Sequence, residues 1–175
     1  MTRVSLSSAA STAALRLAVL FGAGLGLAMP ASAASFYDTW IDGGAGAPCY
    51  ARVYDAAHLA AHPRQRLTRF VLRESSLGAP LKSDEFELTF AFNLKRVDDT
   101  YQSEAICRDA AVAVHCQVEG DGGDFTLRAD PSGLLLTVGK FLQVEGSNSF
   151  SPDLAVGGDD RVIRLFRVPT EACRF

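Results

Sequence analysis

Two histidines are the residues of this chain whose spacing points most directly to chemistry. His58 and His62 stand four residues apart in an alanine-rich run, so a helix there would present both imidazoles on one face, as a zinc site requires. The zinc-protease pattern also needs a glutamate directly after the first histidine, as general base, and Leu59 stands there instead. A third ligand would have to come from His115 or from a carboxylate. We therefore favour an exposed pair without metal; the alternative is a metal-binding protein or metal-dependent hydrolase that uses His58 and His62.

The four cysteines are the second group of residues that could do chemistry. An even number without any C-x-x-C spacing favours two disulfides over a metal site or a reactive thiol, provided that the compartment is oxidising. Four cysteines allow three pairings. We expect Cys107–Cys116, which flank a predicted hairpin turn near 111, and Cys49–Cys173, which open and nearly end the folded region. Oxidised cysteines would leave no thiolate for nucleophilic catalysis.

Residues 1–34 explain why the compartment should be oxidising. A weakly basic start precedes an apolar run over 17–27, and the small residues of 31–33 form a cleavage signal, so we expect a secretory signal peptide cut after Ala33 or Ala34. No second apolar stretch reaches the about 20 residues that span a bilayer. The expected location is periplasmic or secreted, with no membrane anchor after cleavage.

Composition excludes some partners. The chain has 17 Lys and Arg against 20 Asp and Glu, a formal net charge of −3, and no basic cluster. Nucleic-acid binders and proteins that bind anionic membranes concentrate Lys and Arg, so we expect neither class. The chain also lacks a Gly-x-Ser-x-Gly elbow, a P-loop and a dinucleotide fingerprint, and we expect no cofactor. A hydrolase with paired carboxylates stays open, because sequence cannot bring two scattered acids together.

The elements that must position these residues are mostly strands. Within 85–95, five large apolar residues alternate with mostly polar ones, the pattern of a half-buried strand. The single helical signal runs from Asp55, a good N-cap, to the break at Pro63. The other strands that we expect cover 49–54, 65–74, 101–107, 112–118, 125–129, 134–138, 141–145 and 161–168.

This succession predicts an all-β domain: a single antiparallel β-barrel or β-sandwich of eight to nine short strands with one short helix. The predicted organisation is a signal peptide over 1–34, a flexible lead-in over 35–48 and a disulfide-stapled β domain over 49–175. The lead-in contains apolar residues at 36, 37, 40 and 41, which either dock on the domain or form a loose arm.

Two acidic loops could suit calcium. Asp121 to Asp124 and Gly157 to Asp160 each place carboxylates beside glycines, but neither has EF-hand spacing, and such residues are also the usual choice for hairpin turns. We favour turns. Asp159, Asp160 and Arg161 suggest a local ion pair at the start of the last strand.

Three stretches carry a resemblance. Residues 49–63, 118–123 and 158–161 resemble small exported proteins of unknown function from alphaproteobacteria. The resemblance implies a Gram-negative periplasm and brings no catalytic residues. Together with the leader and the cysteines, it predicts a non-enzymatic exported domain that binds a protein or a small-molecule ligand, and no nucleic acid.

Overall fold

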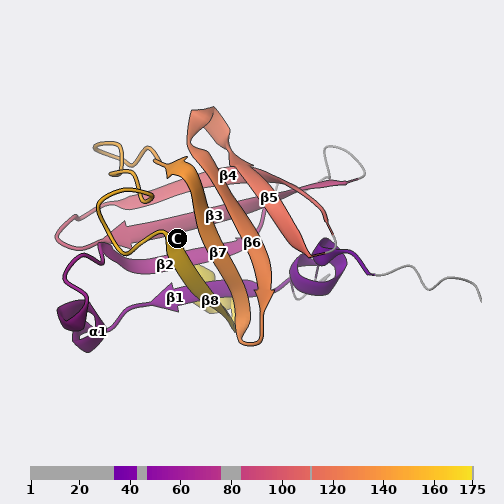
Figure 1. Ribbon diagram of the computed structural model, residues 1–175, viewed down its shortest axis with the longest axis horizontal. Helices are drawn as coiled ribbons and strands as arrows, with labels where there is room; N and C mark the ends of the chain where they lie inside the picture. Colours follow the sequence, from indigo (N-terminus) through magenta and orange to yellow (C-terminus); the bar gives the residue numbers. More distant parts are fainter. Residues whose placement is uncertain (1–33, 43–46, 76–83, 111, 175) are drawn as a thin grey trace, which may run out of the picture. The chain divides into compact units, whose positions relative to one another are not determined.

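The computed structural model describes residues 34–42, 47–75, 84–110 and 112–174, all within one compact unit, Ser32–Phe175. Eight antiparallel strands form a closed barrel, in which each strand pairs with its neighbours along the chain and β8 closes on β1 (Figure 1). The all-β fold is confirmed, and of the two predicted architectures it is the barrel. The strands are β1 (Cys49–Val53), β2 (Leu67–Glu74), β3 (Glu85–Leu94), β4 (Thr100–Arg108), β5 (Ala113–Val118), β6 (Gly123–Asp130), β7 (Gly133–Leu142) and β8 (Val162–Val168).

The barrel has eight strands and not nine, because two of the predicted strands form the single strand β7. The sequence predicts separate strands over 134–138 and 141–145, yet β7 continues to Leu142, where it still pairs with Gly123 of β6 across a register shift. Beyond it, Glu145 makes only an isolated bridge with Phe150. The predicted signal peptide falls almost wholly on residues 1–33, outside the described residues.

The interior of the barrel is filled by aromatic rings. The five apolar residues of the alternating strand β3 are all buried in one core cluster, as their period predicted. Phe70 of β2 stacks on Phe90 and Phe92 with ring centroids 5.7 and 6.0 Å apart, and Phe125 meets Phe90 edge-on. An eight-stranded barrel is just wide enough for side chains to fill it.

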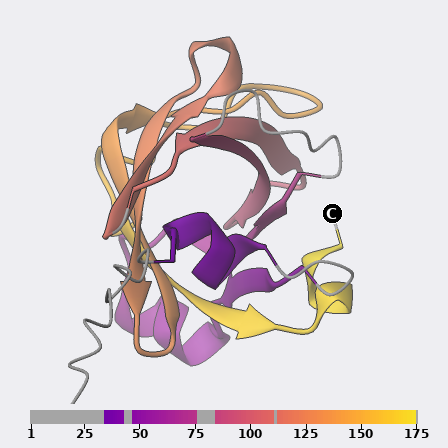
Figure 2. The ribbon, with the colours of Figure 1, turned by 90° about the vertical axis from the view of Figure 1, so that its right-hand side faces the viewer.

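A short helix that the sequence did not predict lies across one end of the barrel (Figure 2). This is η1 (Tyr37–Ile41), a single π-helical turn whose Ile41, with the preceding Phe36, is 2% exposed and belongs to the core. Tyr50 donates a hydrogen bond from its hydroxyl to the carbonyl of Trp40 at 2.7 Å. Of the two alternatives for the apolar residues of the predicted lead-in over 35–48, docking on the domain is the one observed, because Phe36 and Ile41 are buried in the core. Residues 43–46 lie outside the described residues.

The predicted helix forms as α1 (Ala56–Ala61). The carboxylate of Asp55 accepts from the backbone N–H of His58 at 2.7 Å, which is the expected N-cap. No residue of α1 is buried. Among the described residues, no helix is long and apolar enough to cross a membrane.

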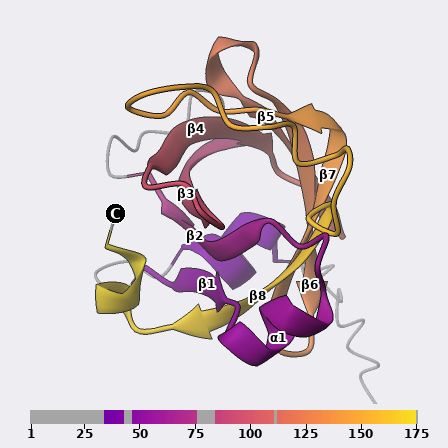
Figure 3. The same cartoon turned by 90° about the vertical axis from the view of Figure 1, so that its left-hand side faces the viewer.

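The C-terminal segment covers part of the outer surface. The 3-10 helix η4 (Thr170–Cys173) contacts β1 and β2, beside which it is seen in Figure 3. Beneath it a second, small apolar cluster forms on the outer face from Cys49, Ala51, Val71, Ala91 and Cys173. A barrel residue on this face is normally exposed, so η4 acts as a lid over this patch of the sheet.

Candidate functional site

All four cysteines form disulfides, in the pairs that the sequence favoured. Cys107 of β4 and Cys116 of β5 are directly opposite each other in the sheet, with Cα atoms 4.0 Å apart. Cys49 of β1 is joined to Cys173 of η4 across 124 residues of sequence. No free cysteine is present, so no thiolate is available as a nucleophile. Two disulfides fit an oxidising environment.

The histidines of α1 lie together on the surface, and in the described part of the chain they belong to no group of three possible metal ligands. The rings of His58 and His62 stack with centroids 4.1 Å apart, and His62 Nδ1 lies 2.9 Å from the carbonyl oxygen of His58. Partial desolvation, followed by the neighbouring His62, lowers the pKa of His58. Among the described residues, the single group of three or more possible metal ligands consists of three glutamates and does not contain His58 or His62. His115, the third ligand considered, contacts Asp124 at 3.1 Å on β5 and β6 instead.

The acidic loop at 157–160 is structural. Asp160 is completely buried and accepts hydrogen bonds from the backbone N–H groups of Arg66 and Leu67 and from two side chains, Gln65 Nε2 and Arg66 Nε. These donors satisfy the carboxylate, and they attach the long β7–β8 connection to the start of β2.

The ion pair predicted within 159–161 is therefore wrong. Asp159 pairs with Arg64 at 2.7 Å, and Arg161 donates to the carbonyl of Gly139. The partners of Asp159 and Arg161 lie far from them in the sequence, so the spacing of neighbouring residues could not predict these contacts.

The other acidic loop is a turn, as expected. Gly120, Asp121 and Gly123 all have positive φ angles there. A Cβ atom at Gly123 would lie 2.1 Å from the carbonyl oxygen of Phe141, so a side chain at this position would displace backbone. Asp124, at the end of the loop, accepts from His115 and from the backbone N–H of Lys140.

Three carboxylates that the sequence did not bring together meet on the outer face of β3 and β4. Possible ligand atoms of Glu87, Glu104 and Glu119 lie within 4.8 Å of one another. Desolvation and then the charges of Glu87 and Glu119 raise the pKa of Glu104, so this carboxyl keeps its proton to a higher pH than an isolated one. Nothing else at the cluster indicates a bound cation.

A small hollow of about 310 Å³ beside Asp99 is formed by the β3–β4 turn and the loop after β7. Desolvation opposes ionisation of Asp99, but hydrogen bonds from the backbone N–H groups of Asn148, Ser147 and Thr100 outweigh it and lower its pKa. The carboxylate thus holds the loop in place, which is a structural task.

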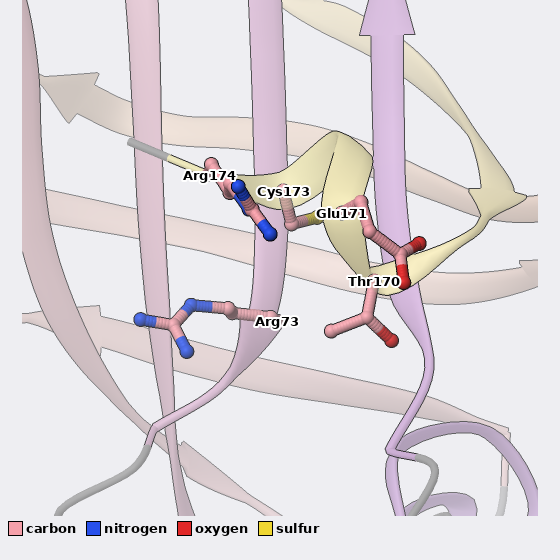
Figure 4. Close-up of a pocket in the computed structure, with 5 residues that line it drawn as sticks. All are labelled: Arg73, Thr170, Glu171, Cys173 and Arg174. Atoms are coloured by element: carbon pink, nitrogen blue, oxygen red, sulfur yellow. The ribbon is translucent and has the colours of Figure 1, made fainter.

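The larger pocket lies between η4 and β2. It has a volume of about 550 Å³, within the range of small-molecule sites. Figure 4 shows that the guanidinium groups of Arg73 and Arg174 lie on the same side of η4, whereas the carboxylate of Glu171 points to the other side. The lining residues are Arg73, Thr170, Glu171, Cys173 and Arg174.

The residues around this pocket are held in place by strand pairing, hydrogen bonds and a disulfide. Arg73 is held by the pairing of β2 with β1 and β3, where it stands opposite Cys49 and Thr89. Arg69, on the same face of β2, donates to the carbonyl oxygens of Ala172 and Arg174 at 2.7 and 2.9 Å. The Cys49–Cys173 disulfide adds a covalent link, so η4 is attached to the sheet from two directions.

Sequence reasoning missed this pocket. Arg73 and Arg174 stand far apart in the sequence and belong to no motif. The available signal was indirect: the predicted Cys49–Cys173 bond brings the C-terminus against β1, beside which β2 presents Arg69 and Arg73 on one face.

Known proteins do not supply a function for this arrangement. Comparison of the chain with protein-family models, curated proteins and solved structures finds no match.

Proposed function

We propose that this protein is an exported, non-enzymatic binding domain that holds a small ligand on its outer surface, in the pocket beneath η4. The observation that carries the proposal is the pocket itself, a hollow of small-molecule size framed by a strand and a disulfide-linked helix. Export rests on the leader, and the two disulfides are consistent with it.

The filled interior argues for an external site. Barrels of this size that carry a ligand inside must leave room for it among the inward-facing side chains. Here Phe70, Phe90 and Phe92 are fully buried and in ring contact, and η1 covers one end. Binding inside would require these rings to move apart, at the cost of the packing that stabilises the core.

The rigidity of the pocket also favours a role in ligand binding. A ligand loses less free energy on binding when the groups that contact it are already fixed. Thr170 and Arg174 belong to a segment held by Cys173 and by the hydrogen bonds from Arg69, so they need little further ordering.

Nuclear magnetic resonance of the mature, disulfide-bonded protein tests the proposal. Amide shifts would be followed during titration with a panel of small anions, cations, sugars and nucleosides. We expect at least one compound to shift amides of η4 and of β2 around Arg73, and not those flanking the buried Phe90. Shifts centred on the barrel interior would overturn the external site, as would a silent panel combined with specific capture of a protein partner through another face.

A further inference from the structure

Three aromatic rings meet at α1, which follows β1 at one end of the barrel (Figure 1). The ring of His58 contacts the ring of Tyr54 with centroids 4.8 Å apart and the ring of His62 with centroids 4.1 Å apart. Tyr54 belongs to the buried core, whereas α1 buries no residue. This ring cluster therefore connects an exposed helix to the interior of the barrel.

The helix depends on contacts of this kind, because a helix of two turns is not stable alone in water. Its other attachments include the N-cap of Asp55 and the packing of Leu59 on the core. Lys95, just after β3, donates from Nζ to the carbonyl oxygens of Leu59 and His62 at 3.2 and 3.4 Å. A change that breaks the ring cluster would leave only these smaller attachments in the described part of the chain.

The groups that face His58 are mostly positive. Arg52 reaches it from β1, Lys95 from the segment after β3, and His62 from α1 itself, and each of them opposes a positive charge on its imidazole. Partial desolvation and then His62 and Arg52 lower the pKa of His58, and the carboxylate of Asp55 offsets this only in part. A charge on this ring is therefore unfavourable in the folded protein.

The Tyr54 side of the ring cluster already holds a cation. The guanidinium carbon of Arg52 lies 4.7 Å from the centroid of the Tyr54 ring, a cation–π distance. A charged His58 would share this ring with Arg52, and the two cations would repel each other. Asp160 also faces Tyr54, but its carboxylate is fully buried and engaged by the hydrogen bonds described above.

We propose that protonation of His58 opens the ring cluster and loosens α1, while the barrel stays folded. The neutral imidazole packs on its neighbours, whereas the imidazolium ion is repelled by them. The stabilisation from this group is therefore complete above the ordinary histidine pKa of about 6.5, and it is lost as pH falls through the lowered folded-state pKa of His58. The helix thus responds to acidification, independently of the pocket beneath η4.

Nuclear magnetic resonance of the mature, disulfide-bonded protein between about pH 8 and about pH 4.5 spans this range and tests the proposal. The imidazole signals report the protonation of each histidine, and heteronuclear NOE values of the amides report local order. We expect the His58 ring to titrate below the ordinary histidine value, and the NOE values of 56–61 to fall with the same midpoint while those of β3 stay high. Order in α1 that persists once His58 is charged would overturn the proposal, as would simultaneous loss of order in β3.

Substitutions assign the response to His58. His58→Gln removes the titrating group, so the order of α1 should become the same on both sides of the transition. The matched control is His115→Gln, which removes the third histidine of the chain, located on β5 in contact with Asp124, and should leave the α1 midpoint unchanged. Loss of α1 order on acidification in His58→Gln would assign the response to another group and overturn the proposal.

A charge substitution tests the electrostatic cause. Asp55→Asn keeps an N-cap acceptor but removes the one carboxylate that favours a charged His58. The midpoint of His58 and that of α1 should therefore move together to lower pH. A His58 midpoint that stays in place, or an α1 midpoint that does not follow it, would contradict the proposed coupling.

Discussion

The seam of the barrel, where β1 pairs with β8 and the chain then continues into η4, differs from the β4–β5 hairpin in how far apart its two sides stand in the sequence. The hairpin joins neighbouring strands, and its disulfide links residues only nine apart in sequence. The seam joins the two ends of the domain, and its disulfide spans 124 residues. The Cys107–Cys116 bond joins residues that the hairpin already brings together. The Cys49–Cys173 bond joins residues from the two ends of the domain, so it closes a loop that contains the whole barrel.

Both regions nevertheless share a weakness. Pairing of β1 with β8 covers only Cys49, Tyr50 and Ala51, and pairing of β4 with β5 begins at Ala105 and ends at Arg108. These are the two shortest ladders of the described barrel; β3 and β4, by contrast, pair from Glu85 to Asn93. A disulfide lies beside each short ladder: Cys107–Cys116 crosses the β4–β5 ladder, and Cys49–Cys173 joins the start of β1 to η4, which follows β8.

The largest expected effect comes from opening the seam. The double variant Cys49→Ala with Cys173→Ala should lose about 5 kcal/mol of unfolding free energy, because a long loop is no longer restricted in the unfolded chain. It should also weaken binding at the pocket beneath η4, because only the hydrogen bonds from Arg69 then hold this segment on the sheet. Urea unfolding of the purified protein measures the first effect and the amide titration the second.

Removal of the hairpin disulfide should cost less. Cys107→Ala with Cys116→Ala is expected to lose about 3 kcal/mol, because the loop it closes is short. Pocket binding should persist, since Cys107 and Cys116 face the interior away from η4. If the hairpin variant proved less stable than the seam variant, or lost the pocket, the contrast between the two regions would be wrong.

A smaller effect tests how the seam holds η1. Tyr50 of β1 is buried and donates to the carbonyl of Trp40, so Tyr50→Phe should cost about 1 kcal/mol in unfolding free energy while keeping the ring in place. Amide hydrogen exchange of 36–41 should become faster in this variant. Unchanged exchange would show that burial of Phe36 and Ile41 alone fixes the helix.

The smallest effect concerns the hairpin side, where Glu104 lies beside Glu87 and Glu119. Desolvation and these two charges raise the folded-state pKa of Glu104 above its unfolded value. The stabilisation from this group is therefore complete at a pH below the unfolded pKa and is lost as pH rises through the folded pKa. Glu104→Gln should raise the Tm at pH 7 and leave it nearly unchanged at pH 4, in thermal melts at both values. Equal shifts at both pH values would rule out charge repulsion as the cause.

Local patterns proved the most predictable part of the molecule. The alternation of β3, the Asp55 cap and the Cys107–Cys116 bond depend on residue types at short spacing, and each is found in the structure. The Cys49–Cys173 bond is also found, and it was predicted from the places of these two residues near the ends of the folded region. The burial of η1 could not be derived, because whether an apolar segment docks depends on a surface that forms only on folding. The partners of Asp160 and the placement of Arg73 and Arg174 in the lining of one pocket likewise arise from strand order, which single-sequence patterns do not determine.

The Cys49–Cys173 bond also makes the domain a covalent ring. Every loop from β1 to η4 lies inside it, so a protease that cuts one of them, such as the turn between β6 and β7, would leave a single linked molecule with its strands still paired. Such a nicked chain keeps its fold wherever proteases reach it, since the disulfide and the strand pairing hold the two pieces together. The ring would then matter less for how the protein folds than for how long it survives.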